Sequence, residues 1–217
     1  MIIDFALKKI NKPRRGGIVF LLFFCFLVSC TTPQPTPPNQ VITINYSPFI
    51  ENQMNEIYAC ANDLSIILKV TNESPDISFR FGEPEIVFDD AYQIGEEEIV
   101  LVTNSKSELG LLSLDEVQNL FASGENVWVY AEGEDVQRLF DQVVMSGRSV
   151  SASAKVAANP NIMVEAISED TNAIGFIPQS FVDDNVQEVY SLGYFPVLAI
   201  TENDAQGTVK NLIGCLQ

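Results

Sequence analysis

The alternation of short apolar runs with amphipathic helical patterns, from Val41 to Gln217, is the feature that most constrains the fold. Runs rich in β-branched and aromatic residues predict strands, and apolar residues spaced three and four apart predict helices. The opening order of strand, helix, strand, strand is typical of an α/β fold with a parallel layer. The predicted strands are Val41–Asn45, Leu64–Val70, Asp76–Phe81, Glu85–Phe88, Glu98–Thr103, Val127–Ala131, Asn172–Pro178, Val186–Tyr190 and Pro196–Thr201.

Capping residues mark where several helices begin. Ser47 precedes Pro48, which suits an N-cap followed by the first helical position. Ser113 and Glu116 stand three residues apart, as in a capping box. The predicted helices run from Ser47 to Asp63, from Ser113 through Phe121, from Glu134 to Met145, from Asn159 through Ser168 and from Gly207 to Leu216.

The first 29 residues have the pattern of a secretory signal. Five basic residues precede an apolar run of eleven residues, Ile18–Val28. As a helix this run is about 16 Å long, whereas the hydrocarbon core of a bilayer is about 30 Å thick. The run is too short to span a membrane, and the pattern predicts a signal peptide over residues 1–29.

The end of this segment, Leu27-Val28-Ser29-Cys30, resembles the lipobox of bacterial lipoproteins. The resemblance implies that Cys30 is acylated, becomes the mature N-terminus and anchors the protein on the extracytoplasmic face of the cell membrane. Residues 30–40 contain four prolines among polar side chains, which is typical of an extended tether. The alternative is an ordinary signal anchor with an incidental cysteine.

Removal of the signal peptide leaves a strongly acidic chain. The full sequence has 12 Lys and Arg against 29 Asp and Glu. Five basic residues and one acidic residue leave with residues 1–29, so the mature chain has a formal net charge of 7 − 28 = −21. Such a charge repels nucleic acid, and we expect no nucleic-acid partner.

Four segments resemble the phosphate-type substrate-binding proteins of ABC importers, members of the type 2 periplasmic-binding superfamily. The segment "IVLVTN", Ile99–Asn104, resembles the strand that crosses between the lobes of these proteins. The segment "LLSLDEVQNLFASG", Leu111–Gly124, resembles a helix that is followed by a strand bearing tryptophan. "NAIGFIP", Asn172–Pro178, and "FPVLAIT", Phe195–Thr201, resemble a later strand and the return strand into the first lobe. A generic α/β domain is the alternative.

The resemblance implies a two-lobed α/β fold with mixed sheets flanked by helices and with shortened lobes. Lobe 1 is expected to comprise residues 41–104 and 194–217, and lobe 2 residues 105–193. A small-molecule ligand is expected in the cleft between the lobes, where helix N-termini stabilise negative charge. The expected partner is an ABC transporter permease, and no cofactor is expected.

The residues that the resemblance places at the ligand depart from the family's anion site. After the first strand stand Tyr46 and Ser47, and Ser47 can donate a hydrogen bond. After the tryptophan-bearing strand the chain reads Glu132-Gly133-Glu134-Asp135. At about 5 Å and an effective dielectric constant near 20, each carboxylate repels an anion by about 3 kcal/mol. A cationic, neutral or metal-oxyanion ligand therefore stays open beside a phosphate-like oxyanion, as does a cleft without a ligand, and simple capping of a helix start also explains the carboxylates.

Two arginines are further candidates for the ligand site. Arg80 follows the run "DISF", where the resemblance implies a loop facing the cleft, and an arginine there can bind a carboxylate. Arg148 follows a predicted helix. For both, the alternative is a surface role.

The chain has no histidine, which removes the commonest general base and metal ligand. The acidic pairs Asp89-Asp90 and Asp183-Asp184 lack the alternating spacing of a calcium loop. We therefore expect neither an enzyme nor a metal site. The alternative to a solute-binding protein is a surface interaction or sensor lipoprotein that keeps the two-lobed fold without a role in transport.

Cys60 and Cys215 are the cysteines that remain beside the signal peptide and Cys30. Each lies near a helix end, the resemblance assigns both helices to lobe 1, and an exported protein meets an oxidising environment. A disulfide between Cys60 and Cys215 is predicted, and two buried free thiols are the alternative.

Overall fold

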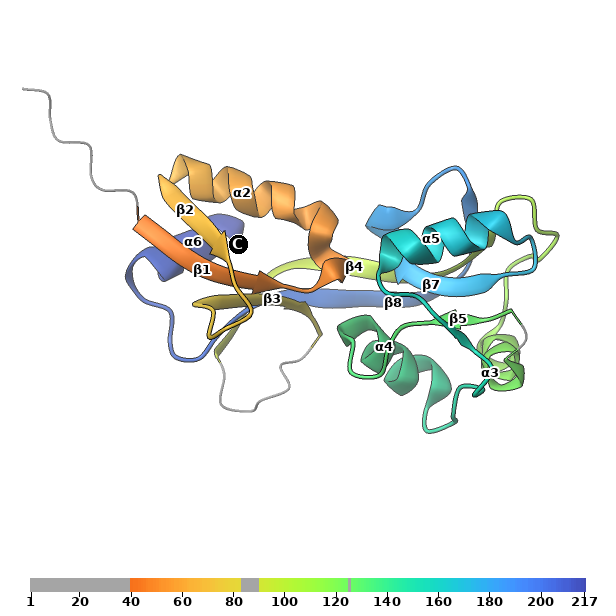
Figure 1. Ribbon diagram of the computed structural model, residues 1–217. Helices are drawn as coiled ribbons and strands as arrows, with labels where there is room; N and C mark the ends of the chain where they lie inside the picture. The colour runs from red at the N-terminus through yellow and green to blue at the C-terminus, as the bar shows by residue number, and fades with distance from the viewer. Residues whose placement is uncertain (1–39, 83–89, 125) are drawn as a thin grey trace, which may run out of the picture. The chain divides into compact units, whose positions relative to one another are not determined.

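The computed structural model describes residues 40–82, 90–124 and 126–217 (Figure 1). The predicted signal peptide, Cys30, all but the last residue of the predicted tether and the predicted strand Glu85–Phe88 lie outside the described residues. Asn39–Gln217 form one compact unit. Its described part is a mixed α/β fold, in which helices flank a six-stranded sheet.

The strands of this sheet are ordered β2-β1-β3-β8-β4-β7. β1 is parallel to β2 and β3, whereas β8 is antiparallel to β3 and β4, and β4 is antiparallel to β7. The sheet is therefore mixed, as the sequence predicts. Its strands are β1 (Gln40–Tyr46), β2 (Ile66–Val70), β3 (Ile77–Phe81), β4 (Asp90–Asn104), β7 (Ile174–Pro178) and β8 (Val186–Thr201).

Two long strands, β4 and β8, connect the two ends of the sheet. Their pairing extends from Asp90 opposite Thr201 to Asn104 opposite Val186, and Figure 1 shows them passing from the side of β1 and β3 to the side of β7. We call the elements β1, β2, β3, α2 and α6 lobe 1, together with the helical turn before α2, and the elements from α3 to β7 lobe 2. The predicted boundary after Gly193 lies inside β8, where the sheet is continuous, so the lobe boundaries stay a prediction.

In lobe 1 the chain turns directly from β1 into a helix. The turn begins with a 3-10 segment, η2 (Pro48–Gln53), and continues as α2 (Met54–Asp63). The helix predicted after Ser47 thus forms, although its first six residues have 3-10 geometry. The last helix, α6 (Gly207–Leu216), packs against α2, and a disulfide joins Cys60 to Cys215 with their Cα atoms 6.0 Å apart.

In lobe 2 the predicted capping box is present. Ser113 and Glu116 exchange the expected hydrogen bonds at the start of α3 (Leu114–Ser123), and Gly124 ends this helix with φ 77°. The single helix predicted over Glu134–Met145 divides into α4 (Asp135–Phe140) and a π-helix, η3 (Asp141–Met145). The other elements are β5 (Trp128–Val129), β6 (Lys155–Val156), α5 (Pro160–Glu169) and η4 (Gln179–Phe181).

Strand lengths were the weak part of the sequence prediction. The two strands predicted on either side of Gly193 form the single strand β8, and β4 begins at Asp90 instead of Glu98. Register shifts in β4, which mark β-bulges, let the two strands stay paired through irregular sequence. In the acidic run Glu96–Glu98, Glu96 and Glu97 lie outside the predicted strand, yet the run pairs with Tyr194–Pro196 of β8. The predicted strand Val127–Ala131 shortens to two residues.

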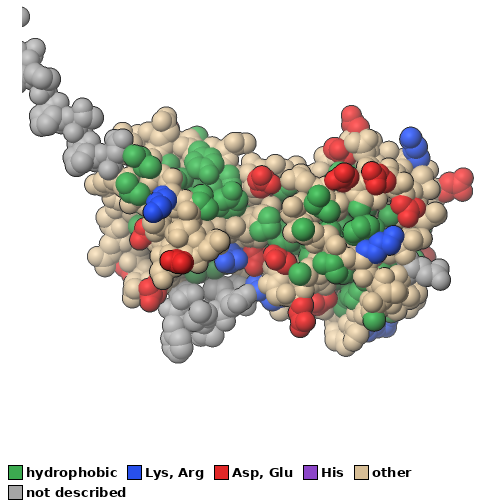
Figure 2. All heavy atoms as spheres, in the orientation of Figure 1, with side chains coloured by type: hydrophobic (Ala, Val, Ile, Leu, Met, Phe, Trp, Pro, Cys, Tyr) green, Lys and Arg blue, Asp and Glu red, His purple; other side chains and the backbone are tan. Residues whose placement is uncertain are grey.

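Most acidic side chains lie on the surface, whereas most of the large apolar side chains are buried. Figure 2 shows acidic side chains on both lobes and a group of apolar side chains over part of lobe 1. The buried core runs without interruption from lobe 1 through β4 and β8 into lobe 2. The exposed large apolar residues of lobe 1 are Val41, Tyr58, Leu64, Ile67 and Val70.

Candidate functional site

The carboxyl ends of β1 and β3 meet at one edge of the sheet, because the two strands are parallel and Tyr46 pairs with Phe79. Ser47 follows Tyr46, and its amide donates a hydrogen bond to the Phe79 carbonyl at 3.0 Å. Arg80 is the next residue of β3. Ligands of open α/β sheets bind outside the carboxyl ends of the strands. The fold thus brings three predicted site residues, Tyr46, Ser47 and Arg80, to one edge.

Ser47 is buried there with an unused hydroxyl. The residue is 2 % exposed, and its Oγ has no hydrogen-bond partner among the described residues. It precedes η2, but its side chain does not cap that helix. A buried hydroxyl without a partner costs about 1–3 kcal/mol, so Ser47 is a candidate contact for a ligand. Tyr46, half-buried beside it, packs against the hydrophobic core.

Arg80 extends from β3 toward lobe 2. Its Nη2 donates a hydrogen bond to Oδ1 of Asn45 at 3.2 Å, and its Nη1 lies 3.9 Å from Oδ1 of Asp135. The side chain is 41 % exposed, so solvent weakens this ion pair. Arg80 is therefore part of strand β3 and not of the loop that the resemblance implies, and a carboxylate of the protein itself lies close to its guanidinium.

That carboxylate belongs to Asp135, the first residue of α4. Asp135 is only 3 % exposed. Its Oδ2 accepts a hydrogen bond from the Phe81 amide at 3.3 Å, and its Oδ1 accepts one from Nη2 of Arg138 at 3.2 Å. These donors compensate for burial of the charge. Sequence reasoning missed Arg138, although its i,i+3 spacing from Asp135 is a signal that could have found it.

The acidic residues Glu132 and Asp135, before and at the start of α4, lie in different environments. Glu132 and Gly133 are exposed. Gly133 has φ 93°, and its carbonyl accepts a hydrogen bond from Nη1 of Arg138 at 2.9 Å. Glu132 instead lines a separate hollow of about 500 Å³, together with Tyr130, Gln137, Asp141, Gly147, Arg148, Ser149 and Val150.

The carboxyl group of Asp141, at the start of the π-helix η3, lines this hollow and has a raised pKa. Partial burial raises the pKa of its carboxyl group, the hydrogen bond from Gln137 opposes the rise, and the charge of Glu132 adds to it. Gln137 also accepts a hydrogen bond from the Tyr130 amide at 2.9 Å. The hollow therefore lies against the same residue, Tyr130, that packs between the lobes.

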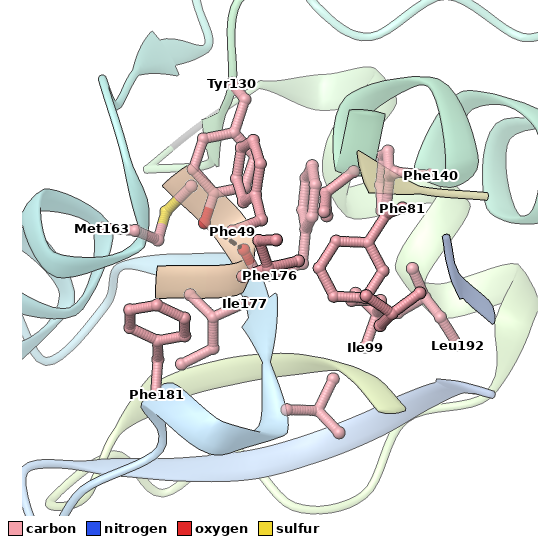
Figure 3. Close-up of a cluster of buried hydrophobic side chains, with 14 of the residues drawn as sticks. Phe49, Phe81, Ile99, Tyr130, Phe140, Met163, Phe176, Ile177, Phe181 and Leu192 are labelled. Atoms are coloured by element: carbon pink, nitrogen blue, oxygen red, sulfur yellow. Dashed lines mark hydrogen bonds between the residues drawn. The ribbon is translucent and has the colours of Figure 1, made fainter. Parts of the chain in front are cut away.

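Figure 3 shows a cluster of buried side chains to which Phe49, Tyr130, Phe140 and Phe176 contribute aromatic rings. Phe49 of η2 meets Tyr130 of lobe 2 edge to face, with ring centroids 4.6 Å apart. Tyr130 contacts Phe176 at 5.2 Å, and Phe176 stacks on Phe140 at 4.2 Å. The Tyr130 hydroxyl donates a hydrogen bond to the Phe176 carbonyl at 2.8 Å, and burial raises the pKa of this phenol well above its usual value. Sequence reasoning assigned none of these rings to the region between the lobes.

Glu97 of β4 connects η2 to η4, the 3-10 segment that follows β7. One carboxylate oxygen accepts a hydrogen bond from Nε2 of Gln53 at 2.5 Å, and the other accepts one from the Ser180 amide at 2.8 Å. The Ser180 carbonyl in turn accepts a hydrogen bond from Nδ2 of Asn52 at 2.8 Å. This network holds η2, and with it Ser47, against η4.

Neither a metal-binding cluster nor a helix that could cross a membrane is present in the described residues. No cluster of three or more His, Cys, Asp or Glu side chains in residues 40–82, 90–124 and 126–217 is arranged to hold a metal ion. None of the helices within those ranges has the length and apolarity needed to cross a bilayer.

Solved structures share this fold, whereas no family model and no curated protein matches the sequence. A putative phosphate ABC transporter substrate-binding protein with bound phosphate, from Clostridium perfringens, matches with a TM-score of 0.73 and 14 % identity. The match covers 82 % of this chain and 93 % of that chain. An ABC-type phosphate transport receptor from Vibrio cholerae matches with a TM-score of 0.63 and 15 % identity, over 81 % of this chain and 93 % of that chain.

The fold is that of type 2 periplasmic-binding proteins. The reduced form of the regulatory domain of OxyR2 from Vibrio vulnificus has it too, with a TM-score of 0.65 and 10 % identity over 82 % of this chain and 94 % of that chain. These three neighbours are transport receptors and a regulatory domain. The predicted family resemblance is confirmed at the level of the fold.

Proposed function

We propose that the chain is a lipid-anchored, extracytoplasmic solute-binding protein that holds a small ligand between its lobes and presents it to an ABC importer. One observation carries the proposal: Ser47 and Arg80 lie at the carboxyl ends of β1 and β3, where Arg80 lies 3.9 Å from Asp135 in the first turn of α4. Ser47 brings a buried hydroxyl without a described partner, and Arg80 brings a partly exposed guanidinium. The likeness to a phosphate-bound transport protein over 93 % of its chain supports the same role.

The side chains at this edge favour a small polar ligand with hydrogen-bond acceptors. Ser47 and Arg80 are donors, and a phosphate-like oxyanion or another small polar solute can accept from both. Asp135 is an acceptor, so a ligand group next to it must donate a hydrogen bond or carry positive charge. A ligand with both kinds of group fits the site best.

The membrane anchor is part of the proposal. Leu27–Cys30 resembles a lipobox, and the proline-rich residues after it suit a tether between the membrane and the folded lobes. Mass spectrometry of the mature N-terminal peptide tests the anchor. An acylated Cys30 is expected, and an unmodified Cys30 would contradict it.

A thermal-shift screen of the mature chain tests solute binding. The compounds are phosphate, sulfate, other oxyanions, metal ions and small organic solutes. A ligand at one hundred times its Kd stabilises the folded state by about 2.7 kcal/mol. The shift is expected to shrink in Ser47→Ala and to persist in the control Ser123→Ala, since Ser123 lies at the exposed end of α3. If no compound changes the melting temperature, the protein does not bind a solute of these classes.

A sensor or interaction lipoprotein is the second candidate function. The contacts of Asp135 and the packing of Phe49 on Tyr130 join the lobes without any ligand, and a regulatory domain shares the fold. Uptake of the solute found in the screen distinguishes the two roles. Loss of uptake in cells that lack the protein supports transport, and unchanged uptake supports the sensor.

A further inference from the structure

The Asp135 carboxylate of lobe 2 lies next to hydrogen-bond donors of lobe 1. Asp135 belongs to α4, whereas the Phe81 amide and Arg80 belong to β3. The carboxylate is 3 % exposed and lies between the Arg80 guanidinium at 3.9 Å and that of Arg138 at 3.2 Å. A small anion bound between two lobes would have this same set of neighbours.

The sheet explains why a buried donor is available at this point. The backbone N–H and C=O groups of Phe79 in β3 point toward β1, because the Phe79 carbonyl accepts the hydrogen bond from the Ser47 amide. The backbone groups of Phe81, two residues further along, point to the same side, since these directions alternate along a strand. The last described pair between β1 and β3 is Tyr46 with Phe79, so β1 has already turned away into η2. A buried amide requires an acceptor, and Asp135 supplies it.

We propose that Asp135 is the internal ligand of an anion-binding site formed by the Phe81 amide and the Arg80 guanidinium, and that this site accepts a small carboxylate when the Asp135 carboxylate is removed. In the folded chain the site is occupied by the protein's own side chain. A free anion is then excluded from the Phe81 amide twice, by occupancy and by charge repulsion, whereas the partly exposed Arg80 guanidinium can still donate a hydrogen bond to the solute of the proposed function. Asp135 thus favours ligands whose group next to it donates a hydrogen bond or carries positive charge.

This inference concerns the site without a solute and does not rest on transport. Its test uses substitutions at Asp135, whereas the proposed function is tested by ligand binding to the unchanged chain. Failure of the solute screen would leave the internal ligand intact. Failure of the test below would leave a solute-binding role intact.

The test compares sodium formate and sodium acetate with sodium chloride at equal ionic strength. In Asp135→Ala the carboxylate is gone, and alanine suits the first turn of a helix. Formate is expected to raise the melting temperature of this variant above its value in chloride. Its apparent affinity should exceed that of the wild type by about tenfold, the worth of one charge-assisted hydrogen bond. Inorganic phosphate, run in parallel, shows whether the vacated site prefers carboxylates.

Three variants complete the experiment. Asp115→Ala removes an exposed aspartate from the first turn of α3 and should gain no response to formate. Asp135→Ala combined with Arg80→Ala should lose part of the gain, because the Arg80 donor is missing while the Arg138 guanidinium stays. Asp135→Asn keeps the shape and removes the charge, so it should fold even if alanine does not, and should gain a weaker response. Equal responses in the wild type and both Asp135 variants would overturn the proposal, as would an undiminished gain without Arg80.

Discussion

Two of the contacts between lobe 1 and lobe 2 differ in chemistry. The aromatic contact consists of Phe49 packed on Tyr130, which packs on Phe176. The polar contact consists of the Asp135 carboxylate beside the Phe81 amide and Arg80. The first is completely removed from water, whereas the Arg80 side chain of the second is 41 % exposed.

The difference assigns the two contacts different roles. Apolar burial stabilises in proportion to area and needs no specific partner atom. A hydrogen-bonded carboxylate depends on direction, and another acceptor can replace it. We therefore expect the aromatic contact to set how firmly the lobes associate, and the polar contact to act on the ligand as proposed above. Two substitutions test the aromatic contact, and a third tests the charge of Asp141 in the neighbouring hollow.

Phe176→Ala should break the aromatic contact. Phe176 is fully buried, stacks on Phe140 and contacts Tyr130. Truncation of a buried phenylalanine costs about 3–5 kcal/mol, and urea denaturation measures the loss. Leu111→Ala is the control, since Leu111 is 85 % exposed and should change stability by less than about 0.5 kcal/mol. Similar losses in the two variants would show that the rings do not stabilise the fold.

Tyr130→Phe removes the hydroxyl and keeps the ring, so it tests the contribution of the hydroxyl alone. The ring packing stays, but the Phe176 carbonyl loses the hydrogen bond that it accepts at 2.8 Å. A buried acceptor left unsatisfied costs about 1–2 kcal/mol, so the free energy of unfolding should fall by less than in Phe176→Ala. Tyr58→Phe, at a tyrosine that is 45 % exposed, is the matched control. An unchanged stability in Tyr130→Phe would mean that ring packing alone explains the contact.

Asp141→Asn should have the smallest effect and a defined pH dependence. Burial raises the pKa of Asp141 in the folded chain, so the folded state binds this proton more tightly than the unfolded state. Stability therefore falls as pH rises through the raised pKa. At pH 7 the variant should be slightly more stable than the wild type, by less than about 0.5 kcal/mol because Asp141 is largely exposed and solvent screens its charge, and the gain should vanish below the ordinary value of 3.8.

Asparagine preserves the acceptor for Gln137, so the substitution isolates the charge. Urea denaturation at pH 7 and pH 3.5 measures the change, with the exposed Asp184→Asn as control. A gain of the same size at both pH values would contradict the assignment to Asp141.

Local signals predicted much of the fold because they act over a few residues. The capping box of Ser113 and Glu116, and the helix Gly207–Leu216, need only the chain around them. The length of β8 was not predictable in this way, because residues without a strand signal pair with the acidic run of β4, about one hundred positions away. Tertiary pairing overrides local preference there.

The candidate site was predicted in part for the same reason. Ser47 follows β1 and Arg80 lies near the end of β3, and strand ends are where ligands of α/β folds bind. The pattern before α4 identified Asp135 as a helix-start carboxylate, but not as a partner of the Phe81 amide, 54 positions away. Glu132 and Asp135 look equivalent in the sequence, and the fold separates them into two environments.

The disulfide between Cys60 and Cys215 closes a covalent ring around most of the protein. The two cysteines are 155 positions apart, and the ring contains every residue of lobe 2 as well as β2, β3, β4 and β8. A protease that cuts the backbone once inside the ring leaves both pieces in one molecule until the bond is reduced. In an oxidising compartment, a nicked copy therefore keeps its two lobes covalently joined.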